Sequence, residues 1–153
     1  MRAAWYGKAK DLLSQEEFGV RVRRKAEEWG GLLDEDAAAR LVLDELGRGE
    51  ADFQAIRDLR EGMEVTLRVR VDAVGPIRSF PRQDGTTGRV VNFEISDGTG
   101  QCRLVLWDQD VALAERGRIG IGSSLRLLDC FVRPSRYGLE ISRGKFGTVL
   151  PEQ

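Results

Sequence analysis

Residues 90–107 read VVNFEISDGTGQCRLVLW, and this stretch is the most informative about the class of fold. Apolar residues alternate with polar ones in its first half, at Val91, Phe93 and Ile95. After the D-G-T-G sequence they return at every second position, at Cys102, Leu104 and Leu106. A period of two is typical of a strand with one buried face, and Asp-Gly is a strong hairpin signal. The stretch therefore predicts two antiparallel strands joined by a tight turn.

The pattern extends on both sides of this hairpin. Upstream, alternation over 65–73 predicts a first strand that Gly75-Pro76 breaks, and residues 78–88 predict a long loop. Downstream, we expect a short helix at 108–116 with Asp108 as its N-cap, strands at 124–133 and 138–142, and a short closing strand at 146–150. Three meander strands, a helix and a hairpin are the order of a five-stranded OB-fold β-barrel, with the helix between strands 3 and 4.

Residues 1–50 have helical spacing instead. Two helices are predicted by their start and stop signals. The first begins with a capping box at Ser14 and Glu17 and ends at Gly30-Gly31, and the second begins with an N-cap at Asp34 and ends at Gly47. A shorter helix is expected within 2–12. We therefore expect an α+β chain with a helical module at 1–50 and an OB-fold nucleic-acid-binding domain at 56–150.

Charge is divided unevenly along the chain. The formal net charge is −1. Residues 1–55 carry nine Lys and Arg against twelve Asp and Glu, whereas residues 56–153 carry fifteen against thirteen. A basic face on a near-neutral protein is enough to hold phosphates, so the charge is compatible with a nucleic-acid partner.

Composition argues against most catalytic chemistry. The chain has no histidine, and its two cysteines, Cys102 and Cys130, lie in apolar runs, which excludes a Cys/His zinc site and His-dependent nucleophiles. Three acids, Asp97, Asp108 and Asp110, could suggest a Mg²⁺ site, but a turn and a cap are ordinary structural roles for the first two. We expect no enzyme activity, no metal and no nucleotide cofactor.

The N-terminal sequence MRAAWYGKAKDLL lacks the apolar core of a signal peptide, and the sequence has no transmembrane run. We therefore expect a cytoplasmic, nucleoid-associated protein with no membrane partner.

The candidate binding residues fall on one predicted surface. In an OB-fold, ligands bind on the outer face of strands 2 and 3, between the loops that join strands 1–2 and 4–5. Trp107 and Arg103 are expected to point outward from strand 3. Around them lie basic and aromatic residues, namely Arg78, Phe80 and Arg82 on the first loop, Arg89 on strand 2, and Arg133, Arg136, Tyr137, Arg143 and Lys145 on the last hairpin. Rings stack on bases and cations pair with phosphates, whereas Arg68 and Arg70 on strand 1 are interpreted as ordinary surface.

Residues 56–150 resemble, in order and spacing, the OB domains of archaeal-type replication protein A. The most specific part is the strand, D-G-T-G turn and strand ending in Leu106-Trp107; residues 56–63, 78–88 and 138–142 also match. The resemblance implies sequence-tolerant binding of single-stranded DNA in replication, repair or recombination. It implies that aromatic residues at the end of strand 3 and on the last hairpin stack on bases.

Trp107 matches the first of these two stacking positions. At the second the chain has Arg143, and Tyr137 is expected to substitute. Family members often carry several OB domains, so a single one is expected to bind weakly unless it forms an oligomer or pairs with other subunits. The N-terminal helices resemble a small module that precedes OB domains in some archaeal members, and we expect this module to contact a protein.

Two other functions are compatible with the sequence. An OB-fold can serve as a protein-interaction subunit of a replication or repair complex, and the same groove can accept single-stranded RNA. A metal-dependent nuclease is the weakest alternative.

Overall fold

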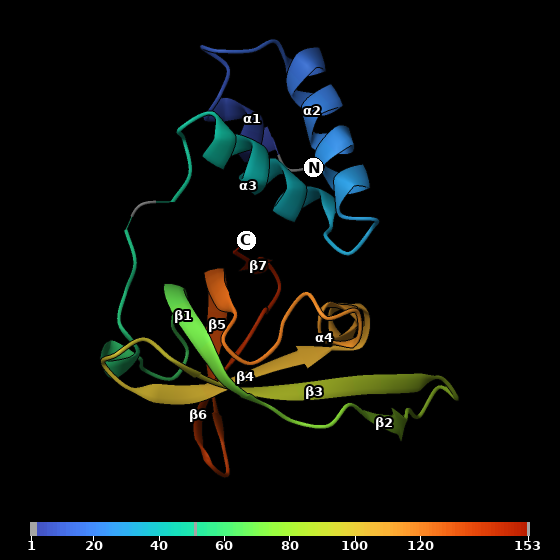
Figure 1. Cartoon of the computed structure of the whole chain (residues 1–153), viewed down its shortest axis with the longest axis vertical. Coiled ribbons are helices and arrows are strands. Elements are labelled where there is room, and N and C mark those ends of the chain that lie inside the picture. The colour runs from blue at the N-terminus through green and yellow to red at the C-terminus, as the bar shows by residue number, and fades with distance from the viewer. Residues whose placement is uncertain (1–2, 51, 153) are drawn as a thin grey trace. The chain divides into compact units, whose positions relative to one another are not determined.

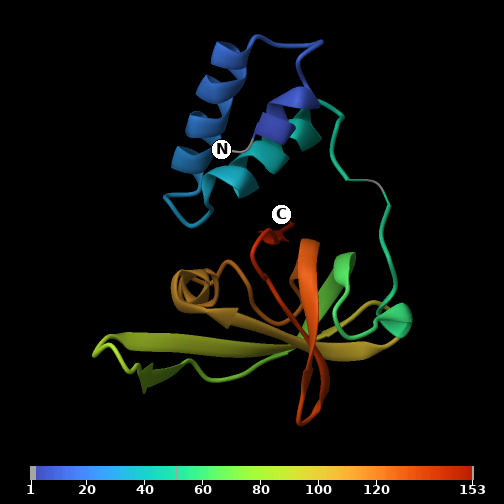
Figure 2. The same ribbon diagram turned by 180° about the vertical axis from the view of Figure 1, so that it is seen from behind.

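The computed structural model describes residues 3–50 and 52–152. These residues form two compact units, the first ending at Asp52 and the second beginning at Phe53. The ribbon of each unit can be followed from both sides in Figures 1 and 2. No helix in the described part of the chain is long and apolar enough to cross a membrane.

In its described residues, the first unit contains three helices, α1 (Ala3–Gly7), α2 (Gln15–Glu28) and α3 (Glu35–Glu45). The predicted N-caps are confirmed: the side chains of Ser14 and Asp34 accept hydrogen bonds from the amides of Glu17 and Ala37, at 3.1 and 2.8 Å. The second half of the capping box differs, because the Glu17 carboxylate lies 3.5 Å from Arg21.

The expected helix within 2–12 is only partly right. Helix α1 ends at Gly7, and residues 8–12 form turns. Residues 1 and 2 lie outside the described part. The helices enclose a small core of aromatic and aliphatic side chains, which includes Trp5, Phe18, Val22, Val42 and Leu43.

The second unit is a closed five-stranded barrel with additions. The barrel strands are β1 (Glu64–Val74), β3 (Thr87–Ser96), β4 (Gln101–Trp107), β5 (Ser124–Ser135) and β6 (Gly138–Ser142). Their order is β1-β3-β4-β6-β5, and β5 pairs again with β1, which closes the barrel. Neighbours are antiparallel except β4 and β6. This is the predicted OB-fold.

Alternation along the strands fills the barrel as predicted. Leu67, Phe93, Leu104, Leu127 and Ile141 come from five different strands, and each is at most 1% exposed. The predicted helix between the third and fourth barrel strands is present as a 3-10 turn, η2 (Asp108–Asp110), and α4 (Val111–Glu115). A last strand, β7 (Thr148–Pro151), pairs with β5 close to the expected closing strand.

The long loop predicted at 78–88 is wrong in part. Residues 78–81 form a short strand, β2 (Arg78–Pro81), which pairs with the first residues of β3. In Figures 1 and 2 this hairpin projects from the barrel. Because both of its faces lie outside the core, its sequence carries no alternation that could have predicted it.

The hairpin turn is built from local hydrogen bonds. The Arg82 amide donates to the Thr86 carbonyl at 2.8 Å, and the Asp84 carboxylate accepts from the Thr86 amide at 3.0 Å. Gly85 has φ of +87°, which favours glycine.

The end of β5 also differs from the prediction. Arg133 and Pro134, expected at or in a loop, belong to β5 and pair with Glu140 and Leu139. Proline is tolerated here because the pairing of β5 with β1 ends at Phe131, so no ladder partner needs the missing N–H. The connection therefore shortens to the two residues Arg136 and Tyr137.

Candidate functional site

The outer face of the sheet carries the candidate site. Strand pairing places Trp107 opposite Val90 and Arg103 opposite Glu94. Glu140 on β6 lies beside Arg103 of β4 and opposite Arg133 of β5. Charged side chains of alternating sign therefore cross this face in one row, with Trp107 at the end of the strand.

Two rings meet at the Trp107 end of β4. The Phe80 and Trp107 ring centroids are 5.8 Å apart and the ring planes form an angle of 89°. The Arg133 guanidinium lies 5.6 Å from the Trp107 centroid. Trp107 nevertheless remains 38% exposed, so one part of its ring is open to a ligand.

Gly88 makes this arrangement of rings possible. It pairs with Phe80 across the hairpin, and a Cβ atom at Gly88 would lie 2.3 Å from Cζ of Phe80. The same atom would lie 2.9 Å from Nη2 of Arg82. The Phe80 ring can therefore lie back along the hairpin toward Trp107 only because residue 88 has no side chain.

A hollow of about 690 Å³ opens beside Trp107. It is lined by Arg82, Thr87, Arg89, Trp107, Asp108, Gln109, Asp110 and Arg143. Each of its three arginines faces a carboxylate: Arg82 pairs with Asp108, Arg89 with Glu115 at 2.7 Å, and Arg143 with Asp110 at 3.0 Å. The hollow is thus lined by three cations and by two of their counterions, Asp108 and Asp110. A guanidinium has five N–H donors, which it can share between a carboxylate and a phosphate.

A second, smaller hollow of about 420 Å³ lies at the other end of β4. Its lining includes Arg103, Tyr137, Glu94, Gln101 and Leu139. The guanidinium of Arg103 lies 4.8 Å from the Tyr137 ring, and that of Arg136 lies 5.9 Å from it. Tyr137 is 71% exposed, so its ring offers a second aromatic surface.

Asp108 does not have the predicted role. It has φ of +55° and no N-cap hydrogen bond; instead its carboxylate accepts from the Arg89 amide at 3.1 Å and from the Arg82 guanidinium. These hydrogen bonds, the Arg89 amide first, lower the pKa of Asp108. The prediction that it caps a helix is therefore wrong, because partners distant in sequence compete for its carboxylate.

Of the three acids considered for Mg²⁺, Asp97 lies far from the other two, and Asp108 and Asp110 each pair with an arginine of the larger hollow. Asp97 precedes β4 and Asp108 follows it, roughly 20 Å away along the strand. Asp110 pairs with Arg143. Among the described residues, no group of three or more His, Cys, Asp or Glu side chains is placed to hold a metal ion.

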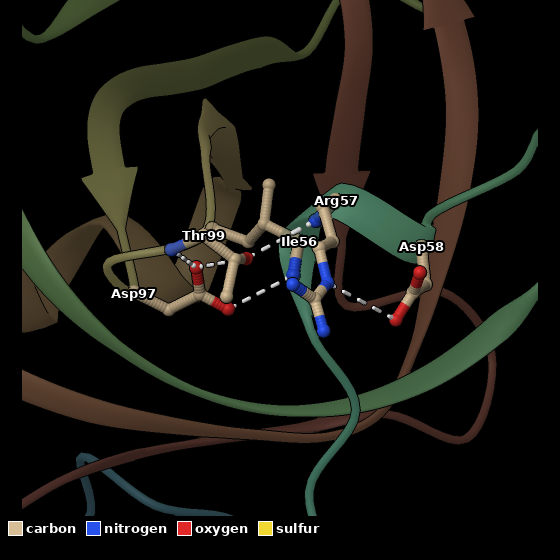
Figure 3. A network of polar contacts seen from close by, with 5 residues as sticks. All are labelled: Ile56, Arg57, Asp58, Asp97 and Thr99. Carbon is tan, nitrogen blue, oxygen red and sulfur yellow. Dashed lines mark hydrogen bonds and ion pairs between the residues drawn. The ribbon is translucent and has the colours of Figure 1, made fainter.

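Asp97 binds the start of the barrel to the D-G-T-G turn, as Figure 3 shows. Its carboxylate accepts from the Ile56 amide at 2.8 Å and from the amide and hydroxyl of Thr99 at 2.9 and 2.6 Å. The Thr99 hydroxyl oxygen accepts from the Arg57 amide at 3.2 Å. Burial raises the pKa of Asp97, but these hydrogen bonds outweigh it and leave the pKa below its ordinary value.

The cysteines are unsuited to chemistry. Cys130 is buried, and burial, followed by the nearby carboxylates of Asp97 and Glu94, raises the pKa of Cys102 to about 12. A thiol of this pKa stays protonated and is a poor nucleophile at neutral pH.

Most of the predicted site residues lie on this one face. Phe80, Arg82, Arg89, Trp107, Arg133 and Arg143 meet at the Trp107 end, and Arg103, Arg136 and Tyr137 meet at the other. Arg78 is exposed on β2, and Lys145 lies in the turn after β6 with its ammonium 5.4 Å from the Phe146 ring.

Sequence reasoning missed two residues of this face. Phe131, which is 38% exposed, pairs with Ser142, which in turn pairs with Val105 of β4. Its spacing of two from Arg133 was a usable signal, since alternate residues of a strand share a face. Glu140 is only 8% exposed and accepts from Nε of Arg133 at 2.6 Å, a role that no local pattern indicates.

Comparison with known proteins gives consistent relatives. No known family profile matches the chain. Replication factor A of Methanothermobacter thermautotrophicus is 30% identical over 139 residues, in an alignment that covers 84% of this chain. The chain spans only 17% of the length of that relative.

Solved structures share the barrel. A replication factor A-related protein from Methanobacterium thermoautotrophicum has a TM-score of 0.56 and 27% identity, over 67% of this chain and 92% of the other. A chain of a replication protein A heterotrimer bound to single-stranded DNA has a TM-score of 0.54 over 66% of this chain and 25% of the other. At 14% identity, this second similarity shows the fold alone.

Proposed function

We propose that this chain, which belongs to the archaeal-type, replication protein A-like OB-fold proteins, binds single-stranded DNA on the outer face of β3 and β4 without catalysis. The observation that carries the proposal is the meeting of Trp107 and three arginines around one hollow, with the Phe80 ring against Trp107. Stacking surfaces beside phosphate-binding cations are the combination that single-stranded nucleic acid requires.

Each group of residues has a distinct role in this proposal. Trp107 and Tyr137 stack on bases at the two ends of β4, and Phe80 supports Trp107. Arg82, Arg89 and Arg143 exchange part of their contact with carboxylates for contact with phosphates, with charge-assisted hydrogen bonds in both states. Arg78, Arg103, Arg133, Arg136 and Lys145 add further cations along the path. Because every base has a stacking face, such binding tolerates many sequences.

The finer biological role belongs to the same proposal. Binding of this kind serves DNA replication, repair or recombination. One OB domain covers few nucleotides, so further copies or partner subunits would raise the affinity. We assign DNA binding to residues 56–150 and contact with a protein partner to the helical module at 1–50.

One observation favours a second candidate function. The arginines of the larger hollow are balanced by carboxylates one to one, so the attraction for a polyanion is weaker than their number suggests. A balanced surface with exposed aromatic rings also suits a protein partner. In that case the OB barrel would act as an interaction subunit.

The test is a titration of fluorescently labelled oligo-dT with the wild type and with Trp107→Ala, at low and moderate salt. We expect about micromolar or tighter binding by the wild type, weakened by salt, and a loss of at least about tenfold in the variant. Ile121→Ala is the matched control, because Ile121 is 76% exposed but lines neither hollow. A parallel oligo-rU titration separates DNA from RNA preference.

If the folded wild type fails to bind at low salt, the DNA proposal is wrong for this chain and the protein-interaction candidate takes its place. If Trp107→Ala and Ile121→Ala bind equally well, binding occurs away from this face.

A further inference from the structure

Asp108 connects three segments at the edge of the larger hollow. It follows Trp107 directly, and its two carboxylate oxygens bind both strands of the projecting hairpin. One oxygen accepts from the Arg89 amide of β3 at 3.1 Å, and the other accepts from the guanidinium of Arg82, next to the end of β2. The end of β4 and the hairpin are thereby joined by one side chain.

Arg82 also contacts the aromatic pair of Phe80 and Trp107. Its guanidinium lies 5.4 Å from the Phe80 ring centroid, and the Phe80 ring in turn meets Trp107 at 5.8 Å. Trp107, Phe80, Arg82 and Asp108 therefore form a closed circuit of contacts. This circuit joins the hairpin to the Trp107 ring through side-chain contacts.

The backbone at Asp108 is suited to this role. Its φ of +55° is adopted at little cost mainly by glycine, asparagine and aspartate. This conformation ends β4 and leaves the carboxylate close to the hairpin, where it accepts from a β3 amide nineteen residues earlier. A conformation of this kind persists only when the surroundings hold it.

We propose that Asp108 is a positioning residue that fixes the β2–β3 hairpin over Trp107 and so favours single-stranded DNA binding, although its own charge repels phosphate. The inference rests on the proposed function and deepens it. Simple electrostatics predicts the opposite sign, since removing an acid from a phosphate-binding hollow makes the hollow more positive. Asp108 favours binding overall if the free-energy cost of ordering the hairpin, which it removes, is larger than its repulsion of phosphate.

The experiment compares two variants of Asp108 with a charge-matched control. Asp108→Gly removes both contacts and suits the positive φ, so the fold is retained. Asp108→Asn keeps an oxygen for the Arg89 amide but loses the ion pair with Arg82. Glu115→Gln is the control, because Glu115 also pairs with Arg89 but does not bind the hairpin to β4.

The first readout needs no DNA. Acrylamide quenching reports mainly on Trp107, since Trp5 and Trp29 are only 4% and 7% exposed, and Trp107→Phe supplies the background. We expect Asp108→Gly to raise the quenching constant of Trp107, Asp108→Asn to raise it less, and Glu115→Gln to leave it unchanged. Unchanged quenching in both Asp108 variants would overturn the proposed positioning role.

The second readout is the affinity for oligo-dT. We expect Asp108→Gly to weaken binding about fivefold, whereas Glu115→Gln leaves it equal or up to about twofold tighter. If the Asp108 variants bind as tightly as Glu115→Gln or tighter, the positioning role is refuted and charge alone governs the hollow. If the wild type does not bind DNA, the proposed function fails, and the quenching result still decides whether Asp108 fixes the hairpin.

Discussion

The two ends of β4 are built differently although one strand connects them. At the Trp107 end, the ring is held by Phe80, Arg133 and the Asp108 circuit, and it is 38% exposed. At the Gln101 end, Tyr137 lies on the two-residue turn between β5 and β6, and its ring is exposed. The guanidiniums of Arg103 and Arg136 lie close to this ring.

In the proposed function, this difference gives the binding face a rigid ring at one end and an adaptable ring at the other. A fixed ring loses little conformational entropy on binding, whereas an exposed side chain must be ordered by its ligand. We therefore expect the Trp107 end to supply most of the affinity and the Tyr137 end to adjust to different bases.

An aspartate also lies near each end of β4, and the two aspartates, Asp97 and Asp108, have different structural roles. Asp97 ties η1 (Ile56–Asp58) to the turn before β4 and so supports the barrel, whereas the role proposed for Asp108 is to support the candidate binding face. Variants at the two ends should thus separate stability from binding.

The largest effect is expected at the Asp97 end, on stability. Asp97→Ala leaves the amides of Ile56 and Thr99 without their acceptor and should lower the free energy of unfolding by about 2 kcal/mol. Urea unfolding at pH 7 measures it. Asp58→Ala is the control, because Asp58 is exposed and its ion pair with Arg57 spans 3.9 Å. Equal losses in both variants would contradict the proposed role of Asp97.

The same contribution should depend on pH in a known direction. The folded pKa of Asp97 is lowered from 3.8, so its stabilisation is complete above that value and is lost as the pH falls through the lower folded pKa. The stability difference between wild type and Asp97→Ala should therefore be constant near neutrality and shrink below a pH of about 4. A difference that grew on acidification would reverse the assigned sign.

The next largest effect is expected from Gly88→Ala. The new Cβ forces the Phe80 ring and the Arg82 guanidinium away from their positions, and oligo-dT affinity should fall about fivefold while the barrel stays folded. Gly120→Ala is the control, since a Cβ there meets nothing within 4 Å. Undiminished affinity in Gly88→Ala would show that the aromatic pair is not needed.

A smaller effect is expected at the other end of β4. Tyr137→Ala should weaken oligo-dT binding about threefold, because one stacking surface is lost but the ordering of an exposed ring is also avoided. Tyr137→Phe keeps the ring and should bind as the wild type does. If Tyr137→Ala costs more affinity than Trp107→Ala, the assignment of the two ends is reversed.

The smallest effect is expected from Arg136→Gln. Loss of one exposed cation should weaken binding about twofold at moderate salt and make the slope of log affinity against log salt shallower by about one. Arg23→Gln, the same charge change on α2, should leave the slope unchanged. Identical slopes for wild type and Arg136→Gln would place the phosphates elsewhere.

The barrel and the helix ends follow from local patterns in the sequence. Alternation in β1, β3 and β4 predicts which side chains are buried, and the signals at Ser14, Asp34 and Asp97-Gly98 act within a few residues, so they can be recognised from the sequence alone. The OB-fold follows from the order of these elements.

The geometry of the candidate site depends on contacts that form only when the chain is folded. The hairpin strand β2 has no buried face, and therefore no hydrophobic period, and the partners of Asp108 lie nineteen and twenty-six residues away. The Glu140 carboxylate binds Arg133 through pairing of β5 with β6, not through a local motif. Side-chain types indicate which chemistry is available, but contacts between distant strands determine which cations are paired and which rings are held in place.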